Sequence, residues 1–482
     1  MLNTFDMSRK SVHPDHGVLL SVVFAAGCLL ASCAVTLWCH GWTSFVVPLL
    51  ALLYFCGWLF LPGLRPDRRQ WVSARNVVVV VFFVKLILNP VLLAVGGIRL
   101  GVLPGMPADS SVMMALLIDA GEYLAVGFGL ECGRILFSRS GPRGAAVSRL
   151  PDGASMRTGI IMLLVGVASL SVTLAPVVAS GNLLGVLAVP QSTGSATWVQ
   201  LMARLGKGFL PYGVVQIAAA MQSLHARRRT YGWPFVPLGV VLLGGIGSSR
   251  VGFMIPCAAF LSTYTRRIHR ISLVMTTIVL SALLGLVVFV GQVRTTISLP
   301  RDASSVGSNL VHFDWMGQLQ VYLQAPQFGA FVIDAADRQG TVRTVIPSLL
   351  ESLPVLGRPF RDSSGSWTYN MSIYGSTIAR DQVLPVSAEI YWNYGMVGVF
   401  LGGVLIGIAF AWLQKMLQAA MVGSVLEYYA WCHLTLLATS LLILSLSVFG
   451  QFLIYDSWPA WLALVLTNRH RSRTDLMTDA SG

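Results

Sequence analysis

The chain has 482 residues, of which 55% are hydrophobic and only 11% are charged, whereas a soluble domain carries roughly 25% charged residues. This composition excludes a soluble cytosolic enzyme, a disordered chain, which needs high charge, and a coiled coil, which needs sustained heptads. The formal net charge of +13 would suggest a nucleic-acid partner in a soluble chain. In a polytopic membrane protein, which we expect here, the placement of charge sets topology instead, so we expect no nucleic-acid partner.

Apolar runs of roughly 17 to 25 residues, the length that crosses a bilayer, predict an all-α protein with about twelve transmembrane helices. In chain order they lie near 17–39, 45–62, 76–98, 111–132, 158–180, 199–222, 233–247, 251–264, 272–292, 389–413, 425–447 and 449–467. The runs 233–247 and 251–264 are short, so they form either two short spans or one re-entrant hairpin. Both alternatives return the chain to the same side.

Arginine clusters between these spans indicate the orientation. With a cytoplasmic N-terminus, most of the 33 Lys and Arg residues fall on one side, including those from Arg65 to Arg75, Arg134 to Arg157 and Arg266 to Arg270. Because cytoplasmic loops carry the excess of positive charge, we expect an even number of spans and both termini in the cytoplasm.

The longest predicted connection runs from Gln292 to Ala388 on the outer side, and it is too long for a mere connector. Its middle, 309–336, has helix-compatible apolar spacing that is broken once, at Pro326. We expect a mostly helical external cap. The chain then divides into nine spans (1–291), the large loop (292–388), and three spans with a cytoplasmic tail (389–482).

Several basic residues lie away from the predicted cytoplasmic side. Arg204 and Lys207 are three residues apart, hence on one helix face, near the outer end of the span 199–222. Arg250 lies at the tip of the short pair, and Arg294 directly follows the ninth span. Such basic side chains either snorkel to the lipid headgroups or belong to a functional site. The planar fork of arginine suits a phosphate or diphosphate, which a lipid carrier would present at this depth.

Three further ionisable residues lie in the middle of predicted spans. Lys85 is on an outgoing helix, and Asp119 and Glu122 are on the next, returning helix. We expect a buried structural ion pair here, with a proton path as the alternative.

The most distinctive segment opens the span 389–413. It reads Pro-Val-Ser-Ala-Glu-Ile-Tyr-Trp-Asn-Tyr-Gly-Met-Val-Gly over 385–398, and Tyr374-Gly375 precedes it. This segment resembles the bacterial O-antigen polymerase family, the Wzy type, whose members close their large periplasmic loop with a small residue, Glu, Tyr, Asn and Gly in this order.

Three other segments are similar to features of that family. They are Ser248-Ser249-Arg250, like its small-residue and arginine turn, Gln292-Val293-Arg294, like the arginine that opens its loop, and Phe328 to Pro347, like its helical stretch that ends in Ile-Pro. The resemblance covers roughly 235–410. The first two hundred residues match only in being membrane spans.

The resemblance implies an oligosaccharide repeat unit polymerase, a glycosyltransferase of the bacterial inner membrane. It would transfer a growing glycan from undecaprenyl diphosphate to an acceptor sugar hydroxyl at the periplasmic face. The implied partners are lipid-linked oligosaccharides, membrane lipid and a chain-length regulator protein. The sequence has no Asp-x-Asp motif and no His/Cys cluster at metal-ligand spacing, so we expect neither a metal nor another cofactor.

Two chemical needs of this transfer select candidate residues. Preplaced cations stabilise the charge that grows on the departing diphosphate, and a carboxylate or histidine at the same face acts as general base. The candidate bases are Glu389 and then His312, and the candidate substrate-binding and diphosphate-binding residues are Arg250, Arg294, Arg380, Arg204, Lys207, Tyr391 and Asn393. The alternative role for Glu389 is that of a structural carboxylate favoured by the helix dipole.

Three other functions stay open. An O-antigen ligase uses the same carrier and a similar arginine-rich loop. A lipid-linked oligosaccharide flippase would predict internal repeats and substrate groups near the midplane, and no repeat is visible. A non-catalytic scaffold predicts activity that does not depend on Arg250, Arg294 or Glu389.

Overall fold

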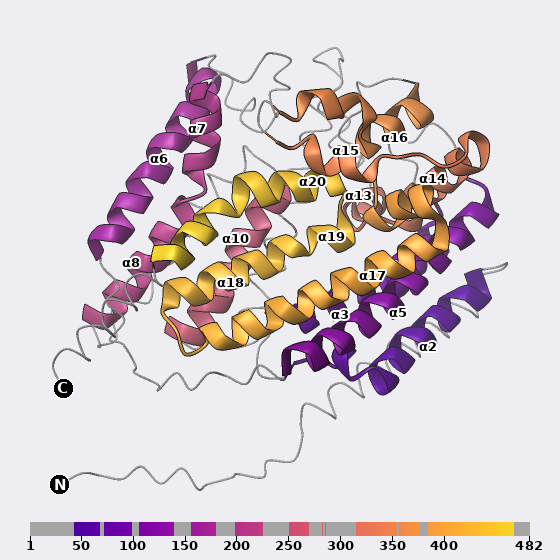
Figure 1. The fold of residues 1–482 in the computed structure, drawn as a ribbon, viewed down its shortest axis with the longest axis horizontal. Helices are drawn as coiled ribbons and strands as arrows, with labels where there is room; N and C mark the ends of the chain where they lie inside the picture. The colour runs from indigo at the N-terminus through magenta and orange to yellow at the C-terminus, as the bar shows by residue number, and fades with distance from the viewer. Residues whose placement is uncertain are drawn as a thin grey trace, which may run out of the picture.

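The computed structural model describes residues 43–67, 72–98, 106–138, 156–179, 198–224, 250–268, 315–353, 356–375 and 384–466, with positions 282 and 285. Within these residues all regular structure is helical (Figure 1), which confirms the predicted all-α class. The predicted spans 17–39, 233–247 and 272–292 lie outside the described residues, apart from those two positions.

The described residues form a series of α-helices. They are α2 (Thr43–Phe60), α3 (Ala74–Phe83), α4 (Asn89–Gly96), α5 (Asp109–Ser138), α6 (Met156–Ala179), α7 (Trp198–Lys207), α8 (Leu210–Leu224), α10 (Arg250–Thr263), α13 (Trp315–Tyr322), α14 (Pro326–Gln339), α15 (Val345–Leu350), α16 (Gly365–Tyr374), α17 (Val386–Ala420), α18 (Val425–Ala438), α19 (Ser440–Ile443) and α20 (Leu446–Gln451). A π-helical turn, Val84–Leu88, joins α3 and α4 into one continuous helix.

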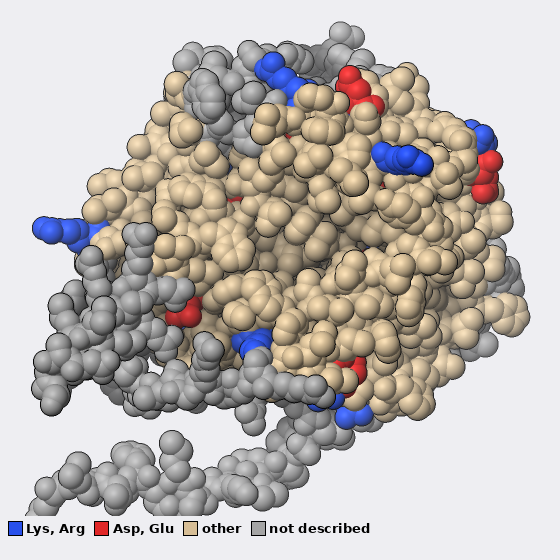
Figure 2. Space-filling view, in the orientation of Figure 1, with Lys and Arg blue, Asp and Glu red and all other residues tan. Residues whose placement is uncertain are grey.

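Three helices in the described part of the chain are long and apolar enough to cross a membrane. They are Ala74–Gly96, Asp109–Ser138 and Val386–Ala420, and shorter apolar helices occur at Phe45–Phe60 and Met156–Val172. Charged side chains are few on the face shown in Figure 2, and large apolar side chains of α17 such as Leu401 and Leu405 are exposed. These features identify a membrane protein. Twelve spans stay a prediction.

Some predicted spans are divided into shorter helices. The run 199–222 forms α7 and α8, because glycines at 206 and 208 flank the turn and Pro211 is compatible only with the first turn of the new helix. The run 425–447 stops being helical at Leu444, which is extended, and the Ser445 side chain then caps α20 by accepting from the Val448 N–H.

The most extensive helix pair in the described residues is α5 against α17. Each helix contributes two glycines four residues apart, Gly129 with Gly133 and Gly403 with Gly407. A Cβ added at Gly129 would lie 2.2 Å from the backbone oxygen of Val404, and one added at Gly407 would meet the backbone of α5 as closely. Two small-xxx-small faces thus let the backbones approach, as is typical of membrane helix pairs.

The directions of α3–α4, α5 and α17 agree with those that the predicted spans require. α5 and α17 run parallel, because Gly121 lies beside Met396 and, further along both helices, Gly133 lies beside Ala411. The α3–α4 helix runs the opposite way, since it begins where the Ala74 N–H donates to a side chain in the C-terminal half of α17.

Basic side chains bind backbone carbonyls near the C-terminal ends of three helices. Arg65 donates to carbonyls of α2, Lys415 Nζ donates to the Phe137 oxygen of α5 at 3.3 Å, and Arg267 donates to carbonyls directly after α17. Cations are favourable at the negative ends of helix dipoles. All three residues belong to segments that the arginine pattern assigns to the cytoplasm.

The described part of the predicted loop forms short helices, α13 to α16, around the N-terminal end of α17 (Figure 1). The predicted break is confirmed, because α13 ends at Tyr322 and α14 begins at Pro326. A small apolar core that includes Phe328, Tyr369 and Trp392 joins this group to α17. We refer to α13 to α16 as the cap.

Candidate functional site

Glu389 lies in the first turn of α17, beneath the cap, and is completely buried. Its Oε1 atom accepts hydrogen bonds from the Ser348 hydroxyl at 2.5 Å and from the Thr344 hydroxyl at 3.1 Å. Ser348 is part of α15, and Thr344 directly precedes that helix. The carboxyl group of Glu389 therefore ties the cap to the long helix.

Asn393, one turn further along α17, makes a second connection to the same residue of the cap. Its Oδ1 atom accepts from the Thr344 N–H at 2.7 Å, and its Nδ2 atom donates to the Thr344 hydroxyl at 2.9 Å and to the Glu389 carbonyl at 2.8 Å. The amide group thus satisfies the backbone just before α15. Glu389 and Asn393 therefore both bind the short segment of the cap at Thr344 and Ser348.

Gly365, the first residue of α16, completes this cluster. Its N–H donates to the Ser348 hydroxyl at 2.7 Å, and a Cβ added at Gly365 would lie 2.2 Å from Glu389 Oε1. The second carboxyl oxygen, Oε2, is buried without a well-aligned hydrogen-bond partner among the described residues, and the backbone of Leu446 is another polar group close to this carboxyl. Only glycine leaves room for the carboxyl group at this contact.

Gly395 separates this cluster from the rest of α17. Its φ of 63° and ψ of −162° interrupt the helical geometry, and this combination is open essentially only to glycine. No atom lies within 4 Å of a Cβ added there. Glycine is therefore required by the backbone dihedral angles and not by crowding from neighbouring atoms. The turn that carries Glu389 and Asn393 is therefore set apart from the helix that continues from Met396.

Tyr391 occupies a different side of α17 from Glu389. It is partly buried and packs against an apolar cluster that contains Ala115, Ile118 and Val399. This contact gives Tyr391 a packing role between α17 and α5, and its predicted binding of substrate stays a prediction.

Of the predicted cations, only Lys207 has a side chain in the described part of the structure, and the contacts described for Glu389 do not involve it. Lys207, half-buried, ends α7, while Arg204 lies within α7 and Arg250 begins α10. The side chains of Arg204 and Arg250 are outside the described part of the structure. His312, Arg294 and Arg380 also lie outside the described residues, so the predicted diphosphate site and the second candidate base stay predictions.

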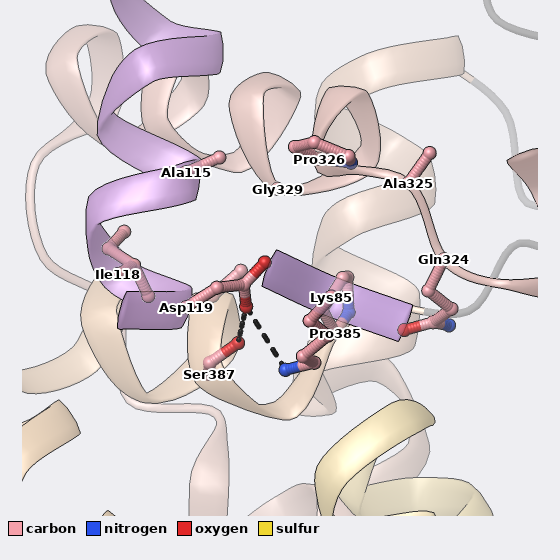
Figure 3. Close-up of a pocket in the computed structure, with 11 residues that line it drawn as sticks. Lys85, Ala115, Ile118, Asp119, Gln324, Ala325, Pro326, Gly329, Pro385 and Ser387 are labelled. Carbon is pink, nitrogen blue, oxygen red and sulfur yellow. Dashed lines mark hydrogen bonds and ion pairs between the residues drawn. The ribbon is translucent and has the colours of Figure 1, made fainter. Parts of the chain in front are cut away.

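A second polar cluster lies beside the first turn of α17. Lys85 Nζ is 3.0 Å from Asp119 Oδ1 and 2.6 Å from Glu122 Oε2, and all three side chains are buried. The predicted intramembrane ion pair is therefore confirmed, with both carboxylates engaged. Ser387 contributes from α17, because its hydroxyl donates to Asp119 Oδ1 at 3.4 Å (Figure 3).

A small cavity opens at this cluster, between the spans and the cap. Lys85, Asp119 and Ser387 face it from one side (Figure 3). Gln324 and Pro326, from the junction of α13 and α14, line its other side. About 10 Å³ is open to the centre of a water molecule, which is near the minimum for one water.

Sequence reasoning missed the residues that hold Glu389. Thr344, Ser348 and Gly365 lie 45, 41 and 24 positions before Glu389, and small polar residues in a loop carry no signal of such a contact. Nor does the position of Ser387 in the segment 385–398 indicate its contact with Asp119. The described residues contain no group of three or more His, Cys, Asp or Glu side chains placed to hold a metal ion.

Comparisons of the chain with protein-family models, curated proteins and solved structures found no match.

Proposed function

We propose that this protein polymerises lipid-linked oligosaccharide repeat units at the periplasmic face of the bacterial inner membrane. The supporting observation is the cluster at the start of α17. Glu389 and Asn393, the acid and the amide of the resembled motif, are both buried and both bind the segment that opens α15. The motif is thus the joint between a membrane helix and the cap, where a lipid-linked glycan would be held.

The proposed reaction needs no metal. The acceptor sugar hydroxyl attacks the anomeric carbon of the growing glycan, the bond to undecaprenyl diphosphate breaks, and the hydroxyl proton passes to a base. Glu389 is the proposed base. Arg250, Arg294, Arg380, Arg204 and Lys207 are the proposed cations that stabilise the departing diphosphate.

The burial of Glu389 sets a condition on this mechanism. In the described conformation Ser348, Thr344 and Gly365 cover the carboxyl group. The acceptor hydroxyl therefore reaches Glu389 only when α15 and the start of α16 move away from α17. Such cap movements that admit a substrate are common in enzymes with buried chemistry.

A deletion strain complemented with variants tests the proposal through the length of its surface glycan. Wild-type chain should restore a ladder of repeat units, whereas Glu389→Gln, which keeps the size of the side chain, should leave a single repeat unit on its acceptor. Asp362→Asn, a change of an exposed carboxylate in the cap, is the matched control and should restore the full ladder.

Three outcomes would contradict the proposal. Long chains that accumulate on the lipid carrier would indicate a ligase. Repeat units trapped on the cytoplasmic side would indicate a flippase. A normal ladder with Glu389→Gln, expressed at the wild-type level, would remove Glu389 from the chemistry.

A further inference from the structure

The buried cluster of Lys85, Asp119 and Glu122 is unbalanced in charge. Two carboxylates and one ammonium group, if all were ionised, would leave one negative charge inside the bundle. Lys85 is 4% exposed, Asp119 8% and Glu122 2%. Uncompensated charge at such sites is strongly unfavourable, whereas a balanced pair is tolerated. The cluster therefore requires one further positive charge.

The neighbouring elements provide no such charge from their described residues. The cavity wall from α14 and α17 consists of uncharged residues. Asp334 of α14 is bonded by Ser111, Glu389 is bonded by the cap, and Tyr123 donates to a backbone oxygen of α2. Lys85 is thus the one cation that the described structure places against both carboxylates.

Ser387 occupies a position that suits a shared proton. Its hydroxyl lies 3.4 Å from Asp119 Oδ1 and also interacts with Glu122. A hydroxyl both accepts and donates, so Ser387 can accept the proton of one carboxylic acid while donating its own to the other carboxylate. The cavity beside Asp119 leaves room for about one water, through which the proton exchanges with solvent.

We propose that Lys85, Asp119, Glu122 and Ser387 form a proton-binding site that holds one exchangeable proton between the two carboxyl groups. The bound proton makes the cluster neutral. The site lies at the joint of the spans, the cap and α17, and it touches α17 two residues before Glu389. It does not rest on the proposed glycan polymerisation, and its failure and the failure of that proposal are separate results.

The test compares the purified full chain in detergent with its Glu122→Gln variant. Glutamine imitates a protonated glutamate, and Lys85 keeps Asp119 as its partner. Because the folded wild-type protein holds a proton that the unfolded chain releases, its stability should fall as pH rises from roughly 4, where a free glutamate titrates, to roughly 8, where a buried one does. The unfolding temperature of the variant should match wild type at the acid end and exceed it by several degrees at the alkaline end.

Infrared spectroscopy gives an independent readout at neutral pH. The wild-type chain should show the carbonyl stretch of a buried carboxylic acid, and both Glu122→Gln and Asp119→Asn should lose it, since either amide leaves one carboxylate opposite Lys85. Lys85→Met should retain the band, because both carboxyl groups then need protons. Comparison with Glu389→Gln separates any contribution of Glu389.

Two results would overturn the proposal. In the first, the unfolding temperatures of wild type and of Glu122→Gln depend on pH in the same way, and neither Glu122→Gln nor Asp119→Asn removes the infrared band. In the second, the unfolding temperature rises when sodium replaces choline at constant ionic strength. That result would assign the site to a metal cation. If Glu122→Gln does not fold, Asp119→Asn serves in its place.

Discussion

A single carboxyl group, that of Glu389, organises the joint between the cap and α17. It is buried, and two hydroxyls converge on one of its oxygens. A buried carboxyl group without such partners is strongly unfavourable. In the proposed chemistry the carboxyl group becomes available only when α15 and the start of α16 move away from α17. The helix-dipole explanation of Glu389 is compatible with its place in the first turn, but it does not account for these partners.

The hydroxyl of Ser348 is the residue-scale test of this joint. Ser348→Ala removes the 2.5 Å contact to Glu389 and the acceptor of the Gly365 N–H. We expect a loss of about 1–3 kcal/mol in the free energy of unfolding, measured by denaturant unfolding in detergent. Ser372→Ala, which removes a more exposed hydrogen bond to Gln339, is the control and should cost less than about 1 kcal/mol. Equal losses in both variants would show that the Ser348 hydroxyl stabilises the fold no more than an exposed hydroxyl does.

At the scale of elements, close contact between α5 and α17 determines where the site lies. The glycines at 129, 133, 403 and 407 bring the two backbones together, which positions Asp119 on α5 beside Ser387 at the start of α17. Lipid offers no hydrophobic gain to helix pairing, so association depends on such close packing. The packing of α5 against α17 therefore determines the positions of both polar clusters.

Gly407→Ala tests this packing. The added methyl group would lie 2.2 Å from the backbone oxygen of Val126, and the helices must separate to accommodate it. We expect a loss of about 1–3 kcal/mol in the free energy of unfolding. Gly121→Ala on α5 is the matched control, because its methyl group meets only the flexible end of Met396, at 3.1 Å. A Gly407→Ala variant as stable as this control would contradict the close packing.

At the scale of the whole molecule, the helices define two ends. The cap lies at the end where α5 and α17 begin, and Arg65, Lys415 and Arg267 bind helix carbonyls where α2, α5 and α17 end. The arginine pattern assigns this second end to the cytoplasm. The arrangement of described helices and the distribution of charge are thus consistent with one orientation.

Cysteine labelling in intact cells tests that orientation. In a background without native cysteines, a cysteine at the exposed Arg358 of the cap should react with a membrane-impermeant reagent. A cysteine at Val422, which is 61% exposed directly after α17, should react only after the cells are opened. Both positions lie at surfaces, so the substitutions should leave the fold intact. The reverse pattern would invert the predicted topology.

The sequence by itself determined the class of this protein and many of its elements. Low charge and long apolar runs suffice for a helical membrane protein, since a lipid environment requires backbone groups to bond within their own segment. The break at Pro326 was predictable because proline cannot continue a helix. The pairing of Lys85 with the acidic residues of α5 was predictable as well, because buried charges need partners.

Only the tertiary structure decided which residues form the two clusters. Thr344, Ser348 and Gly365 meet Glu389 through the folding of the cap onto α17, a contact across 24 to 45 positions that no local pattern encodes. Ser387 reaches Asp119 across 268 positions, because two glycine faces bring their helices together. Local periodicity and charge specify helices, whereas the meeting of distant small residues depends on how closely backbones can pack.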